Sequence, residues 1–308
     1  MVSLLQGPSQ LFITELGQIE QEAAEANQQV SSGLKVTVAS DDPDQISSLL
    51  QLRSELARNT QIQSNLTLAQ TNADAADNAL TSSIQLMDQA VSLATQGANA
   101  TMTAAGEQDL AQQVQAIQQQ MVANANTQVQ GNYIFSGDDP SAPAYTFDPT
   151  AEATNCVDQG STAAATQQIE DPQGGSFPSS LTAQQIFDDR NSDGTYANDN
   201  VFQALNNLYN ALMSGNSDDV AATIDNLQAA SQHLTSMQSF YGEVEDQIQT
   251  AQTFANTYAT QLQTEIGNIQ DADLPTAITE MTQASVAEQA ALQMQAKMPQ
   301  STLFDYLG

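Results

Sequence analysis

The sequence is poor in positive charge, in aromatic rings and in cysteine. Only 5 of its 308 residues are Lys or Arg, against 36 Asp and Glu, which gives a formal net charge of −31. Such a surface would repel phosphate groups, so we expect neither nucleic acid nor a membrane surface as a partner. Aromatic residues make up 5% of the chain and Trp is absent. We therefore expect cores built as seams of Ala, Leu, Ile and Met.

The sequence also shows no motif that is typical of a catalytic or zinc centre. The single cysteine, Cys156, can form no internal disulfide, and the single histidine, His233, has no evident partner for a zinc site or a catalytic triad. No P-loop, HExxH, GxSxG or GxGxxG motif is present. We expect no enzymatic activity, no catalytic residue and no cofactor, and we interpret His233 as a solvated or partly packed helix residue.

Long hydrophobic runs are missing as well. No apolar stretch approaches the roughly 18 to 20 residues that a membrane-spanning helix needs. The first residues, MVSLLQGPSQLFITEL, have neither the basic start nor the continuous apolar run of a secretory signal. If the protein leaves the cell, we expect it to do so without a cleaved signal peptide.

What the sequence does contain is apolar residues at alternating steps of four and three. This heptad spacing predicts long amphipathic helices that pack against one another. The first long run follows Pro43 and continues to about Gln96, which corresponds to a helix roughly 80 Å long. A second run begins near Glu107 after a short connection, which favours an antiparallel hairpin. Helical spacing returns at Asp199 and breaks at residues 273–275.

Shorter seams occur near both ends of the chain. Because alanine and methionine seams bury little area, we expect the two terminal helices to pair with each other and to become ordered only against other subunits. An intramolecular bundle is the alternative use of these seams. The predicted assembly interface, which includes the apolar tail STLFDYLG, consists of Phe12, Leu16, Ile19, Ala23, Val30, Met281, Met294, Leu303, Phe304 and Leu307.

The segment SSGLKVTVASDDP, residues 31–43, interrupts the first helical pattern, and we call it the spoke. Gly33 suits the left-handed end of a helix. The β-branched triplet after it favours extended chain. Asp41 or Asp42 can cap a new helix that has Pro43 at its first position. We predict a stiff joint between two helices, fixed by these four residues.

Residues 131–197 carry no long helical pattern. The opening GNYIFSGDDPSAPAYTFDP combines aromatic and turn residues in a way that is typical of short strands. The predicted fold is mainly α: a long antiparallel helical bundle or coiled coil built from both chain ends, with a small β-rich inserted domain. The predicted domains are terminal helices at 1–38 and 275–308, a long-helix core at 39–130 and 198–274, and the insertion at 131–197.

The stretch DRNSDGT matches the opening of a calcium-binding loop. Its residues Asp189, Asn191, Asp193 and Thr195 offer oxygen ligands at the required spacing. Asn200 stands where the loop would need a bidentate glutamate, and a turn rich in Asn, Asp and Gly forms without metal. A metal-free turn is the favoured interpretation, and calcium is the alternative.

Several of these segments together resemble the bacterial flagellin family. QVSSGLKVTVASDDP is similar to the family's N-terminal segment SSG-(K/L)…(S/A)-DDP, and LATQGAN is similar to its LAxQGAN helix end. STLFDYLG is similar to the family's C-terminal SLFDYL. The run GNYIFSGDD resembles the GxYxFxG segment that opens a small β domain in the hook-associated branch of the family.

The resemblance implies a structural role in the extracellular flagellum, as a hook-associated junction protein that links the hook to the flagellin filament. It implies a ring of identical subunits, contacts with an adjoining hook-associated protein and with flagellin, type III export, and a cytosolic chaperone on the C-terminal helix. The spoke would then join an inner helical layer of a tube to an outer one. The alternatives are a short flagellin that forms the filament itself and a monomeric helical binding module.

Overall fold

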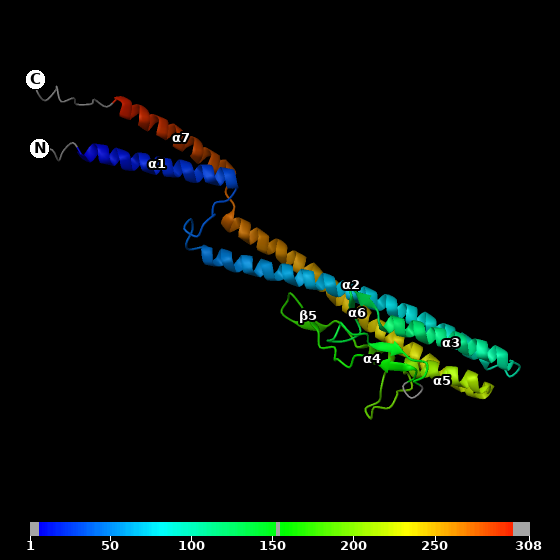
Figure 1. Ribbon diagram of the computed structural model, residues 1–308. Helices are drawn as coiled ribbons and strands as arrows, with labels where there is room; N and C mark the ends of the chain where they lie inside the picture. The colour runs from blue at the N-terminus through cyan, green and yellow to red at the C-terminus, as the bar shows by residue number, and fades with distance from the viewer. Residues whose placement is uncertain (1–5, 152–154, 298–308) are drawn as a thin grey trace, which may run out of the picture. The chain divides into compact units, whose positions relative to one another are not determined.

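The computed structural model describes residues 6–151 and 155–297, which fall into two compact units (Figure 1). The terminal unit combines the chain up to Arg58 with the chain from Tyr258 onward, and the central unit spans residues 59–257. Two long helices, α2 (Ile46–Gly97) and α6 (Ser217–Gln270), contribute to both units. Within the described ranges no helix is both long and apolar enough to cross a membrane.

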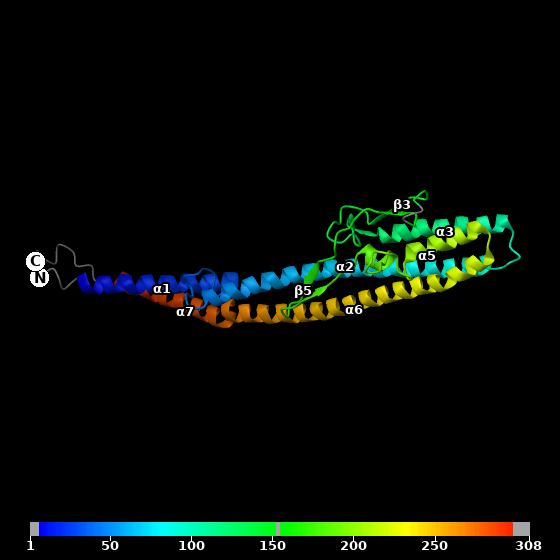
Figure 2. The same cartoon turned by 90° about the horizontal axis from the view of Figure 1, so that it is seen from below.

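In the terminal unit the two ends of the chain form a helix pair. Helix α1 (Gln6–Ser32) lies beside α7 (Leu274–Lys297) in both views (Figures 1 and 2). Small side chains allow the two backbones to approach closely along this contact. The buried members are Ala26, Ala277, Ala284 and Ala291. The predicted pairing of the two chain ends is therefore confirmed.

In the central unit the predicted heptad register is confirmed. Helix α3 (Ala104–Ala125) returns along α2, and the Asn124 side chain donates to the hydroxyl groups of Ser82 and Ser83 at 3.2 and 3.0 Å. Helix α5 (Val201–Ser214) packs against α3 (Figure 2). The residues that follow each other along α2 at alternating steps of three and four are all buried: Ile62, Leu66, Ala69, Ala73, Ala76, Leu80, Ser83, Met87, Ala90 and Ala94.

Local capping explains where these helices begin and end. The Thr103 side chain accepts a hydrogen bond from the Gly106 amide at the start of α3. Helix α5 begins at an equivalent cap, where Asn200 accepts from the Gln203 amide. It ends at Gly215, whose φ of +71° lies in the left-handed region that glycine adopts without strain.

The described residues of the insertion and the turn that leads into it form three separate antiparallel strand pairs and one short helix. Strand β1 (Gln128–Val129) pairs with β2 (Asn132–Tyr133), β3 (Tyr145–Phe147) with β4 (Val157–Gln159), and β5 (Gln168–Glu170) with β6 (Ser176–Pro178). The predicted short strands are thus confirmed. Helix α4 (Ala183–Phe187), which the sequence pattern did not predict, begins with a capping box between Thr182 and Gln185.

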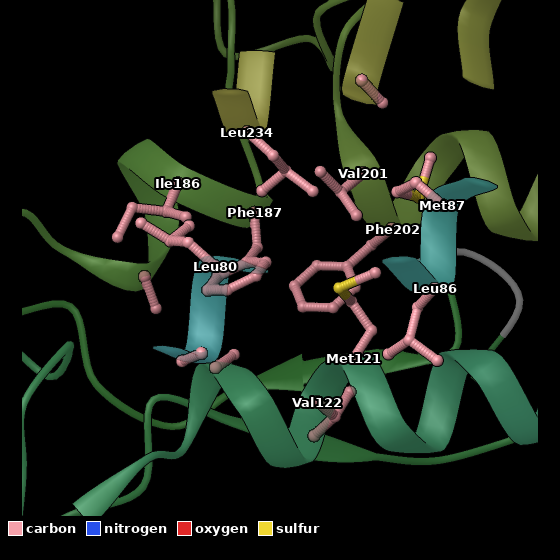
Figure 3. Close-up of a cluster of buried hydrophobic side chains, with 14 of the residues drawn as sticks. Leu80, Leu86, Met87, Met121, Val122, Ile186, Phe187, Val201, Phe202 and Leu234 are labelled. Atoms are coloured by element: carbon pink, nitrogen blue, oxygen red, sulfur yellow. The ribbon is translucent and has the colours of Figure 1, made fainter. Parts of the chain in front are cut away.

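A single buried cluster joins the insertion to the long helices (Figure 3). Its labelled members come from five helices, and they include Leu80, Met121, Phe187, Phe202 and Leu234. The expectation that the core is built of seams of Ala, Leu, Ile and Met was wrong at this place. The chain has few aromatic rings, but it gathers several of them here: Phe135, Tyr145, Phe187, Phe202 and Tyr241, with ring centroids of contacting pairs 5.0 to 6.3 Å apart.

Candidate functional site

In the terminal unit the spoke is bonded to residues 270–272, where α6 ends and the chain leads into α7; the helical pattern therefore ends a few residues earlier than the predicted interruption at 273–275. Leu34 and Asp271 form an antiparallel bridge. The Lys35 amide donates to the Gln270 carbonyl oxygen at 2.6 Å, and the Ala272 amide donates to the Gly33 carbonyl oxygen at 2.9 Å. Gly33 has a φ of +73°, so it can end α1 and turn the chain toward this partner. The spoke and residues 270–272 therefore form one unit, which we call the paired joint.

The two adjacent aspartates of the spoke have different roles. The Asp41 carboxylate accepts hydrogen bonds from the Thr37 and Val38 amides at 2.8 and 2.9 Å, and these bonds lower its pKa below the ordinary value. The Asp42 carboxylate accepts from the Gln45 amide at 3.3 Å, as a helix N-cap does, although regular α2 begins only at Ile46. The sequence left open which aspartate caps the helix, and the hydrogen bonds give that role to Asp42.

Side chains tie the joint to the helices around it. Gln28 donates to the Thr37 hydroxyl at 2.6 Å, and Arg53 donates to the Gln270 side-chain oxygen at 2.8 Å. Val36 is only 2% exposed, whereas most of the spoke around it is open to solvent. The joint is thus held by backbone pairing, by two side-chain bonds and by one buried apolar anchor.

In the described part of the chain, the residues predicted for subunit assembly differ in exposure: most are half-buried, and one is exposed. Phe12, Leu16, Ile19, Ala23 and Val30 are half-buried, on the side of α1 that faces α7. Met281 is half-buried on α7, while Met294 is 64% exposed. The remaining three, Leu303, Phe304 and Leu307, lie outside the described residues. Further large apolar side chains are exposed on the same two helices: Leu11, Ile13, Ile278, Val286 and Leu292.

In the central unit a buried carboxylate joins the insertion to helix α5. Asp188 is 1% exposed and accepts hydrogen bonds from the Tyr145 hydroxyl at 3.0 Å and from the Asn200 amide group at 2.8 Å. Its other partner is Arg190, whose guanidinium lies 2.7 Å from the same carboxylate and over the ring of Tyr196. Residue type and spacing alone give no sign of this network.

The calcium-like loop closes on itself. The Asp193 carboxylate accepts from the hydroxyl and amide of Thr195 at 2.6 and 3.0 Å, and these bonds lower the pKa of Asp193. Asn191 donates to the Thr195 hydroxyl at 3.0 Å. These internal bonds support the turn without a metal ion, and calcium binding stays the untested alternative.

His233, the single histidine of the sequence, has two polar partners that its sequence neighbours do not indicate. Its Nε2 atom lies 2.9 Å from the Gln185 carbonyl oxygen, and its Nδ1 atom lies 3.5 Å from Asp199 Oδ2. One potential ligand atom from each of Asp189, Asp199 and His233 lies within 4.8 Å of the others. These residues are brought together only when α4, the loop after it and α6 pack, and no spacing in the sequence signals that contact.

The two helical ends of the chain match the two conserved regions of one protein family. Residues 6–139 match the bacterial flagellin N-terminal helical region, and residues 224–307 match the bacterial flagellin C-terminal helical region. Together the two matches cover most of the chain, and they include both segments of the paired joint. The chain therefore belongs to the bacterial flagellin family. Membership supports a structural role in the flagellum.

Several solved structures of flagellar proteins are similar to this fold. A putative flagellar hook-associated protein from Vibrio parahaemolyticus matches with a TM-score of 0.63 at 17% identity, over 75% of this chain and 100% of its own. Hook-associated protein 3 from Legionella pneumophila matches with a TM-score of 0.58 at 14% identity, over 71% of this chain and 98% of its own. FlgL from Bacillus cereus matches with a TM-score of 0.55 at 18% identity, over 70% of this chain and 98% of its own. The search of curated proteins returned no match.

Proposed function

We propose that this protein is a structural subunit of the junction between the flagellar hook and the flagellin filament. The observation that carries the proposal is the fold: hook-associated proteins match it over 98 to 100% of their own chains. The short insertion between the two flagellin regions is consistent with that branch of the family. The proposed role is mechanical and involves no catalysis.

The proposed assembly uses the terminal helices. Because one face of α1 is turned to α7, contacts with neighbouring subunits would use the outer faces, where Leu11, Ile13, Val286, Leu292 and Met294 are exposed. Burying one such side chain contributes roughly 1.5 to 3 kcal/mol, repeated at each subunit of a ring. We also propose that the half-buried seam from Phe12 to Val30 and the tail residues Leu303, Phe304 and Leu307 become fully buried on assembly.

The paired joint would set the angle between the helix pair and the long helices. Its backbone bonds connect residues more than 230 positions apart, so the two chain ends move as one piece. A subunit with a loosened joint would fold but would fit poorly between an adjoining hook-associated protein below and flagellin above. We further propose that the chain reaches the cell exterior by flagellar export with no cleaved signal peptide, escorted by a chaperone on its C-terminal helix.

Deletion of the gene combined with immunogold labelling tests this function. We expect the deletion strain to retain hooks, to lose filaments and to secrete flagellin into the medium. In the complemented strain, antibodies against the insertion at residues 131–197 should label isolated flagella only at the hook end of the filament. Label along the whole shaft would instead identify a short flagellin. Absence of label from flagella, with normal swimming of the deletion strain, would favour a monomeric binding module.

A further inference from the structure

One cluster of metal-ligating side chains lies outside the proposed assembly surfaces. Asp189 follows α4, Asp199 precedes α5 and His233 lies in α6, so three separate segments of the central unit meet at this point. All three side chains are half-buried, and one potential ligand atom from each lies within 4.8 Å of the others. We propose that these three residues form a binding site for a divalent transition metal ion of the zinc class.

The orientation of the imidazole ring supports this assignment. A carbonyl oxygen can only accept a hydrogen bond, so Nε2, at 2.9 Å from the Gln185 carbonyl oxygen, carries the ring hydrogen. This leaves Nδ1 facing Asp199 Oδ2 at 3.5 Å, where two lone pairs meet unless a cation or a second proton lies between them. Histidine ligands of metals are held in this way, with the other ring nitrogen donating to a backbone carbonyl.

The local charge also favours a cation. Arg190 is the only Lys or Arg in residues 131–197, and its guanidinium is paired with Asp188 at 2.7 Å. The carboxylates of Asp189 and Asp199 therefore face the cluster without an arginine or lysine of the insertion to balance them. His233, with a side chain only 12% exposed, closes the inner side of the cluster.

The donor set selects the class of metal. One imidazole nitrogen with two carboxylates suits zinc and its neighbours among the transition metals, whereas calcium and magnesium prefer oxygen ligands alone. The ligands of a tetrahedral zinc ion, bonded at about 2.0 to 2.2 Å, lie about 3.3 to 3.6 Å from one another. The distance of 3.5 Å between His233 Nδ1 and Asp199 Oδ2 already meets this spacing. The three ligand atoms lie within 4.8 Å of one another, so zinc binding would draw the carboxylates closer together, and solvent molecules would complete the coordination.

Such an ion would fasten the insertion to helix α6. Asp189 and Asp199 bracket the calcium-like loop, while His233 belongs to the long helix. This site is distinct from a calcium site in that loop, because it uses Asp189 together with residues that the calcium motif does not contain.

The test uses the full-length chain without a histidine tag, freed of metals by a chelator. Calorimetric titration with zinc chloride should give one ion per chain, and calcium chloride should give no comparable binding. Because the chain has a single histidine, nitrogen NMR of the labelled imidazole reports on His233 without ambiguity. Zinc should shift the Nδ1 signal while Nε2 stays protonated. This measurement needs no variant, so it holds even if a substitution disturbs folding.

Matched variants separate this site from its alternatives. His233→Gln and Asp199→Asn should each weaken zinc binding more than tenfold, whereas Asp193→Asn, in the same loop but outside the cluster, should leave it unchanged. Zinc binding that survives His233→Gln would overturn the proposal. An imidazole with both nitrogens protonated and unaffected by zinc would also overturn it, in favour of a simple ion pair with Asp199. Calcium binding without zinc binding, lost in Asp193→Asn, would overturn it in favour of the calcium loop.

Discussion

The hydroxyl group of Tyr145 donates a hydrogen bond of 3.0 Å to the carboxylate of Asp188, and both residues are 1% exposed. Tyr145 belongs to β3, in the first half of the insertion, and Asp188 directly follows α4. The bond therefore connects the strand region of the insertion to the segment that leads into α5. Because a buried carboxylate depends on all of its donors, this bond should matter for the stability of the whole central unit.

Replacing Tyr145 with Phe should lower the free energy of unfolding by about 1 to 3 kcal/mol, because one donor to a buried charge is lost while the ring still fills its place. Urea unfolding followed by circular dichroism measures the change. Tyr133→Phe is the matched control, since Tyr133 lies in the same insertion and is half-exposed. An equal effect of the two substitutions would contradict the role given to the Asp188 network.

Alkaline pH should destabilise the protein through two buried tyrosines. Burial raises the pKa of Tyr145 and of Tyr241 well above the ordinary value, so both keep their protons in the folded chain. The unfolded chain loses those protons above about pH 10. The free energy of unfolding should therefore fall as pH rises past that point, by up to about 1.4 kcal/mol per pH unit for each tyrosine.

Urea unfolding at several pH values between 9 and 11 measures this slope. Tyr145→Phe and Tyr241→Phe should each make the slope shallower, and Tyr133→Phe should leave it as in the wild type. If neither substitution at a buried position changes the slope, other groups govern the alkaline transition.

Removing the Asp41 carboxylate should impair assembly more than folding. Asp41→Ala deletes the acceptor for the Thr37 and Val38 amides and so frees the spoke, but the buried core of the central unit lies elsewhere. We expect an unchanged thermal midpoint for that unit together with poor complementation of motility in a deletion strain. Asp44→Ala, an exposed neighbour, is the control. Normal swimming of the Asp41→Ala strain would argue against the joint as an assembly element.

Gly137→Ala should be more damaging than Gly174→Ala. Both glycines have positive φ, of +63° and +98°, so alanine is strained at either position. At Gly137 the added methyl group would also fall on the backbone carbonyl oxygens of Ala163 and Ala164, while nothing lies within 4 Å at Gly174. We expect a fall in thermal midpoint for both variants, larger by several degrees for Gly137→Ala. The opposite order would mean that this contact is looser in solution.

The sequence predicted the long helices well because their burial is periodic. Ile62 and Ala94, at the two ends of the α2 register, are both buried, as the heptad spacing requires. Family resemblance likewise rested on contiguous segments such as QVSSGLKVTVASDDP, which can be recognised without knowing what they touch. These features are local or repeat at fixed steps, so one chain without a structure is enough to find them.

The contacts between distant segments could not be predicted in the same way. The bond from Lys35 to Gln270 uses backbone atoms, which leave no mark in residue type. Asp188 and Asp189 look alike in the sequence, yet the first is 1% exposed within a network and the second is half-exposed beside His233. Only the packing of α4 and α5 against α6 distinguishes them.

The pairing of α1 with α7 has a consequence for the order in which the chain folds. The two helices are separated by some 240 residues of intervening sequence, so their contact closes a very long loop and has the largest entropic cost of any in the fold. During synthesis α1 emerges first and stays without its partner until α7 has been made. The helices of the central unit, whose connections are much shorter, can form in that interval. The first helix to leave the ribosome is therefore expected to be among the last to reach its final place.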